Sequence, residues 1–216
     1  MFSVTERIRQ VNQPRGGYVP LKKFIEKNYI DDKIVQDLDL SVYESIQGMA
    51  VDYLTRLMLG IPKHIIFEVA LKGAEKVNQL EKAEKLFSKI SGLDTDSIIS
   101  VCYLVCYDAD FRKNEGFHFF PMGIATNEAM INNIAIMVER SLLFFKKNGS
   151  VIRSGFTFPG AYNDVISSGD GDFLTKDTLW DFKAIKKRPD KNHTLQILVY
   201  YIILWVFILR IQNLKI

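Results

Sequence analysis

Apolar residues recur every three or four positions over much of the first two thirds of the chain, a spacing that predicts amphipathic helices. In residues 40–59 (LSVYESIQGMAVDYLTRLML) this spacing forms one continuous apolar stripe. The stripe ends at Gly60 and Pro62; glycine tolerates a left-handed helix cap, and proline cannot continue a helix. Its members are Val42, Ile46, Met49, Ala50, Tyr53 and Leu57.

The same periodicity predicts helical structure in residues 64–92 and again at about 95–107. The stretch DADFRKNEGFHFFPM, residues 108–122, lacks it and is expected to be irregular. A long helix is predicted over 126–147. We expect the Thr126 hydroxyl to cap its first turn and Asn148-Gly149 to end it.

The pattern changes after residue 150. The runs SVIRSGFTF, DVISSGDGDFLT and TLWDFKAI are separated by Pro-Gly, Ser-Gly and Lys-Asp turns. Short runs between such turns predict three strands of an antiparallel meander over residues 150–185. The elements together indicate a mixed α/β (α+β) fold. We expect a single domain of 216 residues, with 61–148 as a mainly helical insertion and 150–205 as the core sheet and helix.

A last helix is expected from about Thr194. Ile197 to Ile211 is almost continuously apolar but is about 15 residues long, interrupted by Arg210 and short of the roughly 20 residues that a membrane span requires. We therefore expect a buried core helix, with or without a last strand after it; a membrane-associated or partner-docked C-terminus is the alternative. No membrane partner is expected.

Composition places the chain among globular proteins, since 48% of the residues are hydrophobic and 25% are charged. The net charge of +3 does not by itself indicate a nucleic-acid binder. Cys102 and Cys106 are spaced poorly for a disulfide and are two ligands short of a metal site, so we expect buried apolar residues. The N-terminus has charges throughout and no apolar core of a signal peptide, which together with the cysteines predicts a cytoplasmic protein.

The candidate chemistry lies in the C-terminal third. Asp172 follows Gly169 and Gly171, which permit a bend and a close approach of the backbone to a ligand. Asp181 comes nine residues later on the next predicted strand, so the two carboxylates can approach each other across neighbouring strands.

Alternation along a strand turns Asp181 and Lys183 to one side, and Trp180 and Phe182 to the other. Carboxylates gathered beside a lysine are unfavourable unless a cation or a phosphate completes the cluster. An ordinary hairpin with a polar face stays the alternative.

Further polar groups follow in the sequence. Lys186, Lys187, Arg188 and Lys191, with His193, form a basic stretch suited to a phosphodiester backbone, although a solvated turn has the same composition. Gln196 and Tyr200 lie four apart on the otherwise apolar last helix, where both can hydrogen-bond into a site.

These motifs resemble the PD-(D/E)XK nuclease superfamily and, within it, the RecB-like branch that includes CRISPR-associated exonucleases. The resemblance rests on G-x-x-D at 169–172, D-F-K at 181–183 and Q-x-x-x-Y at 196–200. The stretches QGMAVDYLTR and GDGDFLTKDTLWDFK also resemble an uncharacterised group of bacterial and phage proteins. The resemblance implies a restriction-endonuclease-like core, a three- to four-stranded mixed sheet flanked by helices, and Mg²⁺- or Mn²⁺-dependent hydrolysis of nucleic acid, with DNA favoured over RNA.

The resemblance also implies roles for single residues. Asp172, Asp181 and the backbone carbonyl of Phe182 are expected to bind the metal. Lys183 is the expected catalytic lysine, and Gln196 and Tyr200 match the helix motif beside the active site. The branch usually carries an upstream acid as well, for which Asp52 is the candidate and Glu44 a weaker substitute.

Some features depart from that branch. Several of its members hold an iron–sulfur cluster with four cysteines, whereas this chain has two, so no cluster is expected. A nuclease-fold protein without turnover, which binds nucleic acid or a protein partner, stays the alternative function. Nothing in the sequence indicates the oligomeric state or the preferred substrate structure.

Overall fold

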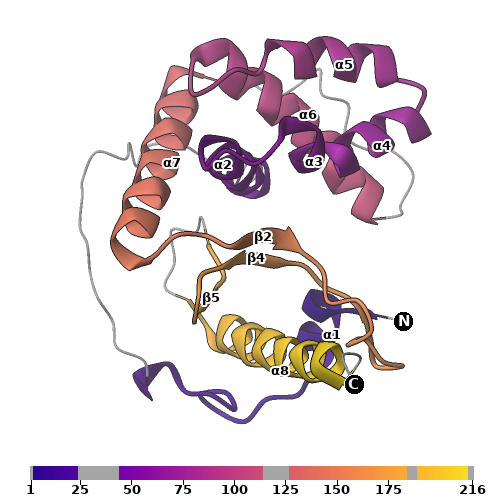
Figure 1. Ribbon diagram of the computed structural model, residues 1–216, viewed down its shortest axis with the longest axis vertical. Coiled ribbons are helices and arrows are strands. Elements are labelled where there is room, and N and C mark those ends of the chain that lie inside the picture. The colour runs from indigo at the N-terminus through magenta and orange to yellow at the C-terminus, as the bar shows by residue number, and fades with distance from the viewer. Residues whose placement is uncertain (1, 24–43, 114–126, 184–188, 214–216) are drawn as a thin grey trace. The chain divides into compact units, whose positions relative to one another are not determined.

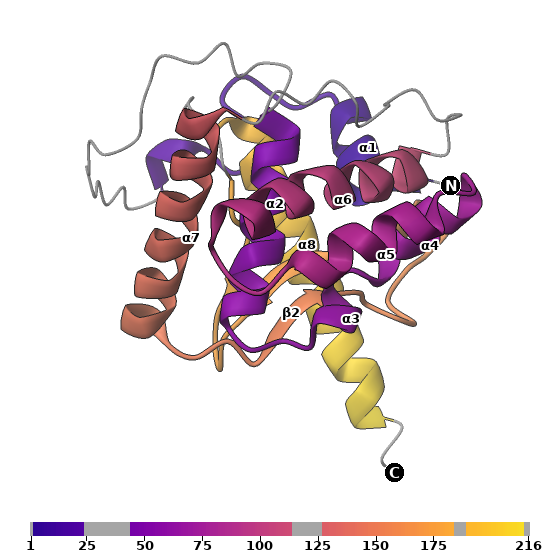
Figure 2. The same ribbon diagram turned by 90° about the horizontal axis from the view of Figure 1, so that it is seen from above.

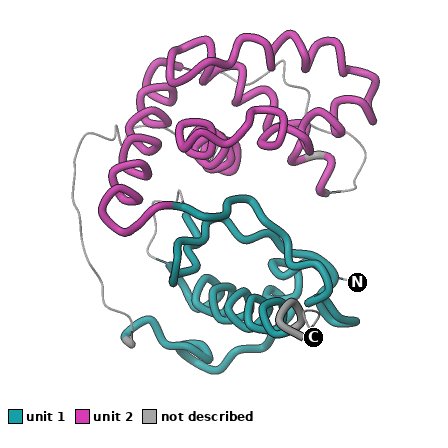
Figure 3. Tube along the Cα trace, viewed as in Figure 1, with its two compact units in different colours: residues 1–29, 151–182, 186–216 teal, residues 30–150, 183–185 magenta. Residues whose placement is uncertain are grey.

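The computed structural model describes residues 2–23, 44–113, 127–183 and 189–213 (Figure 1). Contacts divide the chain into two compact units (Figure 3): unit 1 comprises residues 1–29, 151–182 and 186–216, and unit 2 comprises 30–150 and 183–185. The mixed α/β class is confirmed, because unit 1 combines strands with helices and the described part of unit 2 is helical.

Unit 2 is built around the long helix α6. This helix packs against α2, α4 and α5, and α2 also packs against α7 (Figure 2). Its elements are α2 (Glu44–Met58), α3 (Lys63–Ile66), α4 (Glu68–Lys76), α5 (Leu80–Lys89), α6 (Thr95–Lys113) and α7 (Glu128–Asn148). The predicted apolar stripe faces this core, where Ile46, Ala50 and Tyr53 are buried; Val42 lies outside the described residues.

Residues 64–92 form three helices, because the backbone turns at two places that the apolar period does not reveal. Phe67 separates α3 from α4, and Asn78, with a φ of 56°, lies in the turn between α4 and α5. Asparagine is one of the few residues that adopt this left-handed conformation readily.

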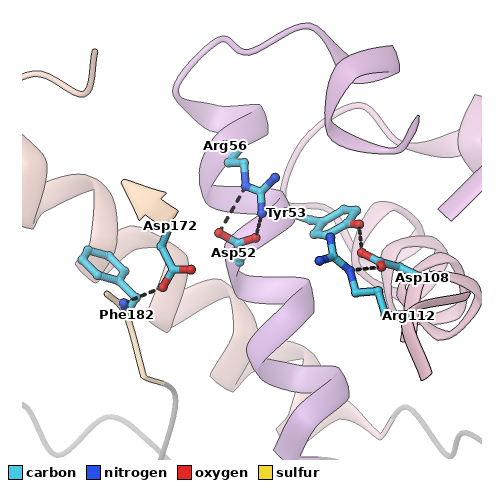
Figure 4. A network of polar contacts seen from close by, with 7 residues as sticks. All are labelled: Asp52, Tyr53, Arg56, Asp108, Arg112, Asp172 and Phe182. Atoms are coloured by element: carbon cyan, nitrogen blue, oxygen red, sulfur yellow. Dashed lines mark hydrogen bonds and ion pairs between the residues drawn. The ribbon is translucent and has the colours of Figure 1, made fainter. Parts of the chain in front are cut away.

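Helix α6 is longer than predicted and runs to Lys113, so the irregular segment expected from Asp108 was placed wrongly. Asp108 is buried within the helix, and its carboxylate accepts hydrogen bonds from the Tyr53 hydroxyl and from Arg112 (Figure 4). A polar residue satisfied in this way does not interrupt a buried helix. Residues 114–122 lie outside the described part of the chain.

The predicted limits of α7 were nearly right. Asn127, not Thr126, is its N-cap: the Asn127 side chain accepts from the Met130 N–H at 2.8 Å. The helix ends at Asn148, and Gly149 follows with a φ of 114°, as the Asn-Gly pair predicted.

The cysteines of α6 are buried and free, which confirms the prediction. Burial raises the pKa of Cys102 to about 12.

Unit 1 contains two small sheets instead of the single mixed sheet that was expected. Strands β2, β4 and β5 form an antiparallel sheet in that order, whereas β1 pairs with β3 in parallel. The predicted second strand, DVISSGDGDFLT, is thus divided at Gly169 and Asp170 between two sheets. The strands are β1 (Phe2–Ser3), β2 (Arg153–Phe156), β3 (Ile166–Ser168), β4 (Gly171–Leu174) and β5 (Leu179–Trp180).

Helix α1 (Val4–Gln10) was not predicted. A capping box begins it: the Glu6 N–H donates to Ser3 Oγ at 3.3 Å, and the Ser3 N–H donates to Glu6 Oε2 at 2.7 Å. Val4 and Ile8 lie one turn apart and pack with the long helix α8 (Lys191–Asn213); Phe156 of β2 packs against the same apolar cluster. A short 3₁₀ helix, Leu21–Lys23, follows.

Helix α8 starts three residues before Thr194 because Asp190 caps it. The Asp190 carbonyl accepts from the Thr194 N–H at 3.2 Å, and its carboxylate accepts from the N–H groups of Asn192 and His193. The helix continues to Asn213, so a strand directly after its apolar run does not form.

One side of α8 is buried and the other is exposed. Leu195, Tyr200, Ile203 and Phe207 are buried, whereas Tyr201, Ile202, Trp205, Ile208 and Leu209 are exposed. The 19 residues Lys191–Leu209 are long and apolar enough to cross a membrane, with 39% of the most apolar window buried. The argument from insufficient length is therefore wrong, and the cytoplasmic location stays a prediction.

We predict that Gly73→Ala destabilises unit 2. A Cβ at Gly73 would overlap the backbone carbonyl oxygen of Tyr107 and lie 3.2 Å from Phe111 Cβ, so α4 and α6 would have to separate. Overpacking of this kind costs about 1–3 kcal/mol and outweighs the helix propensity gained from alanine. Urea denaturation measures the change. The control is Gly92→Ala, whose Cβ meets nothing within 4 Å and should change stability by less than about 0.5 kcal/mol. Equal shifts in both variants would contradict the packing argument.

Candidate carboxylate site

The pairing of β4 with β5 brings Asp172 and Asp181 to the same end of a short hairpin. Phe173 pairs with Trp180 and Leu174 with Leu179. Continuing this register by one residue places Asp172 opposite Asp181. The Phe182 N–H donates to Asp172 Oδ2 at 2.8 Å, so a side chain extends the pairing beyond the strand (Figure 4).

The opposite side of the hairpin is apolar, as alternation predicted. The Phe182 ring packs against the fully buried ring of Phe173 at a centroid distance of 5.0 Å. The Trp180 indole N–H donates to Thr175 Oγ1 at 3.1 Å. These contacts fix which way the carboxylates turn.

Gln196 joins α8 to this hairpin. Its Nε2 donates to Asp181 Oδ1 at 3.2 Å. Tyr200, one turn further along, is 4% exposed and stacks on Phe158 at a centroid distance of 5.9 Å. The structure thus brings four residues of the predicted site together in unit 1: Asp172, Asp181, Gln196 and Tyr200.

The surroundings of Tyr200 keep its phenol protonated. Burial raises the pKa of Tyr200, and the hydrogen bond with Gln196 lowers it by less. The negative charges of Asp181, Asp172 and Asp170 raise this pKa further. Tyr200 is therefore a neutral hydroxyl beside carboxylates.

The glycines before Asp172 serve packing against side chains. A Cβ at Gly169 would lie 2.7 Å from Val4 Cγ2 and 3.1 Å from Tyr200 Cε1. A Cβ at Gly171 would lie 2.6 Å from the Phe156 ring. Both glycines therefore allow side chains of unit 1 to pack closely on the backbone, and the expected approach to a ligand stays a prediction.

Tyr162 and Asp170 were missed by sequence reasoning. The Tyr162 hydroxyl accepts from the Phe158 N–H at 3.0 Å and donates to the Gly169 carbonyl at 2.6 Å, which anchors the loop that leads into β4. Burial raises the pKa of Tyr162, and the charge of Asp170 adds to this shift. Asp170 could have been predicted, because it belongs to the sequence Gly169-Asp170-Gly171-Asp172. No sequence pattern indicates a role for Tyr162.

Two further candidates fall in unit 2. Lys183 is half-buried and belongs to unit 2 by its contacts. Asp52 lies on α2 and forms an ion pair with Arg56 across one turn, with Arg56 Nε 3.2 Å from Asp52 Oδ1 (Figure 4). The side chain of Glu44 lies outside the described part of the structure.

The basic stretch is described in part. Lys186, Lys187 and Arg188 lie outside the described residues, whereas Lys191 is exposed at the start of α8.

His193 Nδ1 lies 2.8 Å from Asp190 Oδ1 and accepts from the Asp190 N–H at 2.9 Å. Partial burial raises the pKa of Asp190, but the N–H groups of Asn192 and His193, together with the His193 side chain, hold it below its usual value. His193 is therefore part of the helix cap.

The donors in unit 1 fit a hard divalent cation. Two carboxylates and the Phe182 carbonyl are oxygen ligands, and Mg²⁺ in proteins takes one or two carboxylates while waters and substrate phosphates complete its shell. Among the described residues, no group of three or more His, Cys, Asp or Glu side chains is placed to hold a metal ion. The arrangement suits an open site that a substrate completes, not a closed protein cage.

Comparisons with protein-family models, with curated proteins and with solved structures found no match for this chain.

We predict that Asp172→Ala destabilises unit 1 by about 1–2 kcal/mol, because the half-buried Phe182 N–H loses a charged acceptor. Asp172→Asn keeps an acceptor oxygen and removes one negative charge near Asp181, so its stability in EDTA should stay within about 0.5 kcal/mol of wild type. Thermal unfolding of both variants in EDTA checks this. If both lose the same stability, the hydrogen bond to Phe182 does not support the hairpin.

Proposed function

We propose that this protein is a metal-dependent nuclease that hydrolyses phosphodiester bonds of DNA. The observation that carries the proposal is the convergence of Asp172 on β4, Asp181 directly after β5, and Gln196 and Tyr200 on successive turns of α8. An ordinary hairpin would not need a glutamine and a buried tyrosine of another element to face its acids. The order of these residues along the chain is that of the nuclease motifs named above.

In this proposal each residue has a defined role. Asp172, Asp181 and the Phe182 carbonyl hold Mg²⁺ or Mn²⁺, which when bound supplies polarisation of the scissile phosphate and a more acidic water. Gln196 orients the Asp181 carboxylate through its hydrogen bond. Tyr200 contributes a hydroxyl that stays protonated.

Lys183 orients the attacking water, assists its deprotonation and offsets negative charge that develops on the phosphate. We further propose that the sheet and α8 form a reduced restriction-endonuclease-like core. The helical unit then serves as the insertion that selects the nucleic acid. Asp52 is assigned no metal in this proposal, because its ion pair with Arg56 already accounts for its charge.

Metal-dependent cleavage of labelled DNA tests the proposal. We expect wild type to cleave single- or double-stranded DNA with Mg²⁺ or Mn²⁺ and to be inactive in EDTA. Lys183→Ala and Asp181→Asn should each reduce the rate by at least about 10²-fold, the usual range for a lost acid–base or electrostatic group. The matched control is Lys176→Ala, an exposed lysine in the β4–β5 turn, which should keep full activity.

Two results would contradict the proposed catalytic site. If wild type binds DNA and Asp181→Asn binds it as well or better, but neither cleaves it, the chain is a nuclease-fold binding protein and the enzymatic proposal fails. If cleavage persists in Lys183→Ala and Asp181→Asn, the activity arises elsewhere.

A further inference from the structure

The segment after α1 and the start of α8 border a hollow of about 540 Å³ in unit 1 that the carboxylate site does not use. Its charged lining residues are Arg15, Lys22, Asp190 and Lys191. They come from two parts of the chain more than 160 positions apart in sequence. The fold therefore gathers cations that the sequence separates.

The charges of the hollow favour an anion. Three cations face one acid, and the carboxylate of that acid, Asp190, already accepts from the Asn192 and His193 N–H groups and contacts His193 Nδ1. Arg15, Lys22 and Lys191 are exposed and can contact a ligand from solvent. A concave surface with an excess of one sign of charge concentrates counter-ions.

The N-terminal segment is held against α8 by two contacts. Gln13 is buried, and its Nε2 donates to Asn192 Oδ1 at 2.8 Å. Gly17 has a φ of 83°, and a Cβ there would lie 2.8 Å from Lys191 Cβ, so only glycine allows this approach. The backbone that carries Arg15 is thus fixed to the first turn of α8.

The hollow and the carboxylate site are offset along the axis of α8. Lys191 precedes Gln196 by five positions on one helix, which is about 8 Å along the axis at 1.5 Å per residue. A strand of duplex DNA advances about 3.4 Å per nucleotide, so this axial offset corresponds to roughly two nucleotides.

We infer that the hollow binds the sugar–phosphate backbone of a nucleic acid strand, with Arg15, Lys22 and Lys191 contacting phosphates about two nucleotides from the phosphate at the carboxylates. The position of this subsite on the substrate rests on the proposed nuclease function. Its existence is tested by binding alone.

The test measures the affinity for fluorescently labelled single-stranded oligonucleotides of several sequences by anisotropy in EDTA, as a function of salt concentration. For the double variant Arg15→Gln/Lys22→Gln we expect weaker binding to all sequences. The plot of log K against log salt should become shallower by about 1.4, because each phosphate contact on a single strand contributes about 0.7. Both side chains are exposed, so the fold should be unaffected, and circular dichroism checks this.

The control variant is Arg9→Gln/Lys176→Gln, which removes two exposed cations of unit 1 outside the hollow and should leave the slope unchanged. The inference is overturned if the two variants behave alike, if the slope of the first is unchanged, or if wild type binds no oligonucleotide. Cleavage by wild type together with unchanged binding by the first variant would overturn only the subsite. A changed slope without cleavage would overturn only the enzymatic proposal.

Discussion

The pairing of β4 with β5 is two residue pairs long, and the candidate site depends on it. A ladder of this length does not hold two carboxylates in place by itself. The hydrogen bond from the Phe182 N–H to Asp172 lengthens it from one side, and the bond from Gln196 to Asp181 joins it to α8. Both bonds use the carboxylates as acceptors, so the groups assigned to the chemistry also maintain the local fold.

Helix α8 makes polar contacts with two other segments of unit 1 and also contributes to its apolar core. Asn192, Gln196 and Tyr200 recur every four residues, and the first two bond to Gln13 and Asp181. Polar groups on a largely apolar helix are unfavourable when buried without partners, and these partners remove that penalty. The same row therefore joins the N-terminal segment and the hairpin to one helix, while its apolar neighbours form the core with α1.

Sequence reasoning located the four converging residues because two simple periods govern them. Alternation on a strand fixes the sides of Asp172 and Asp181, and the helical repeat fixes Gln196 and Tyr200. It failed where structure depends on contacts distant in sequence, as in the pairing of Phe2 with Ile166. It failed at the start of α8 because the polar run from Lys191 to His193 hides the helical period. It also overlooked α1, although Ser3 and Glu6 carry the signature of a capping box.

In the proposed nuclease, the charges of unit 1 would place the metal and the bound strand at different positions. Asp170, Asp172 and Asp181 all act on Tyr200, so the phosphate of a substrate meets negative charge there. The hollow near the start of the same helix has three cations and one acid. A metal-free protein would then hold a strand at the hollow and repel it at the carboxylates. A divalent cation held by Asp172 and Asp181 would offset two of these negative charges and so weaken that repulsion. In the proposed function, Asp172 and Asp181 would therefore repel the scissile phosphate less with a cation bound than without one.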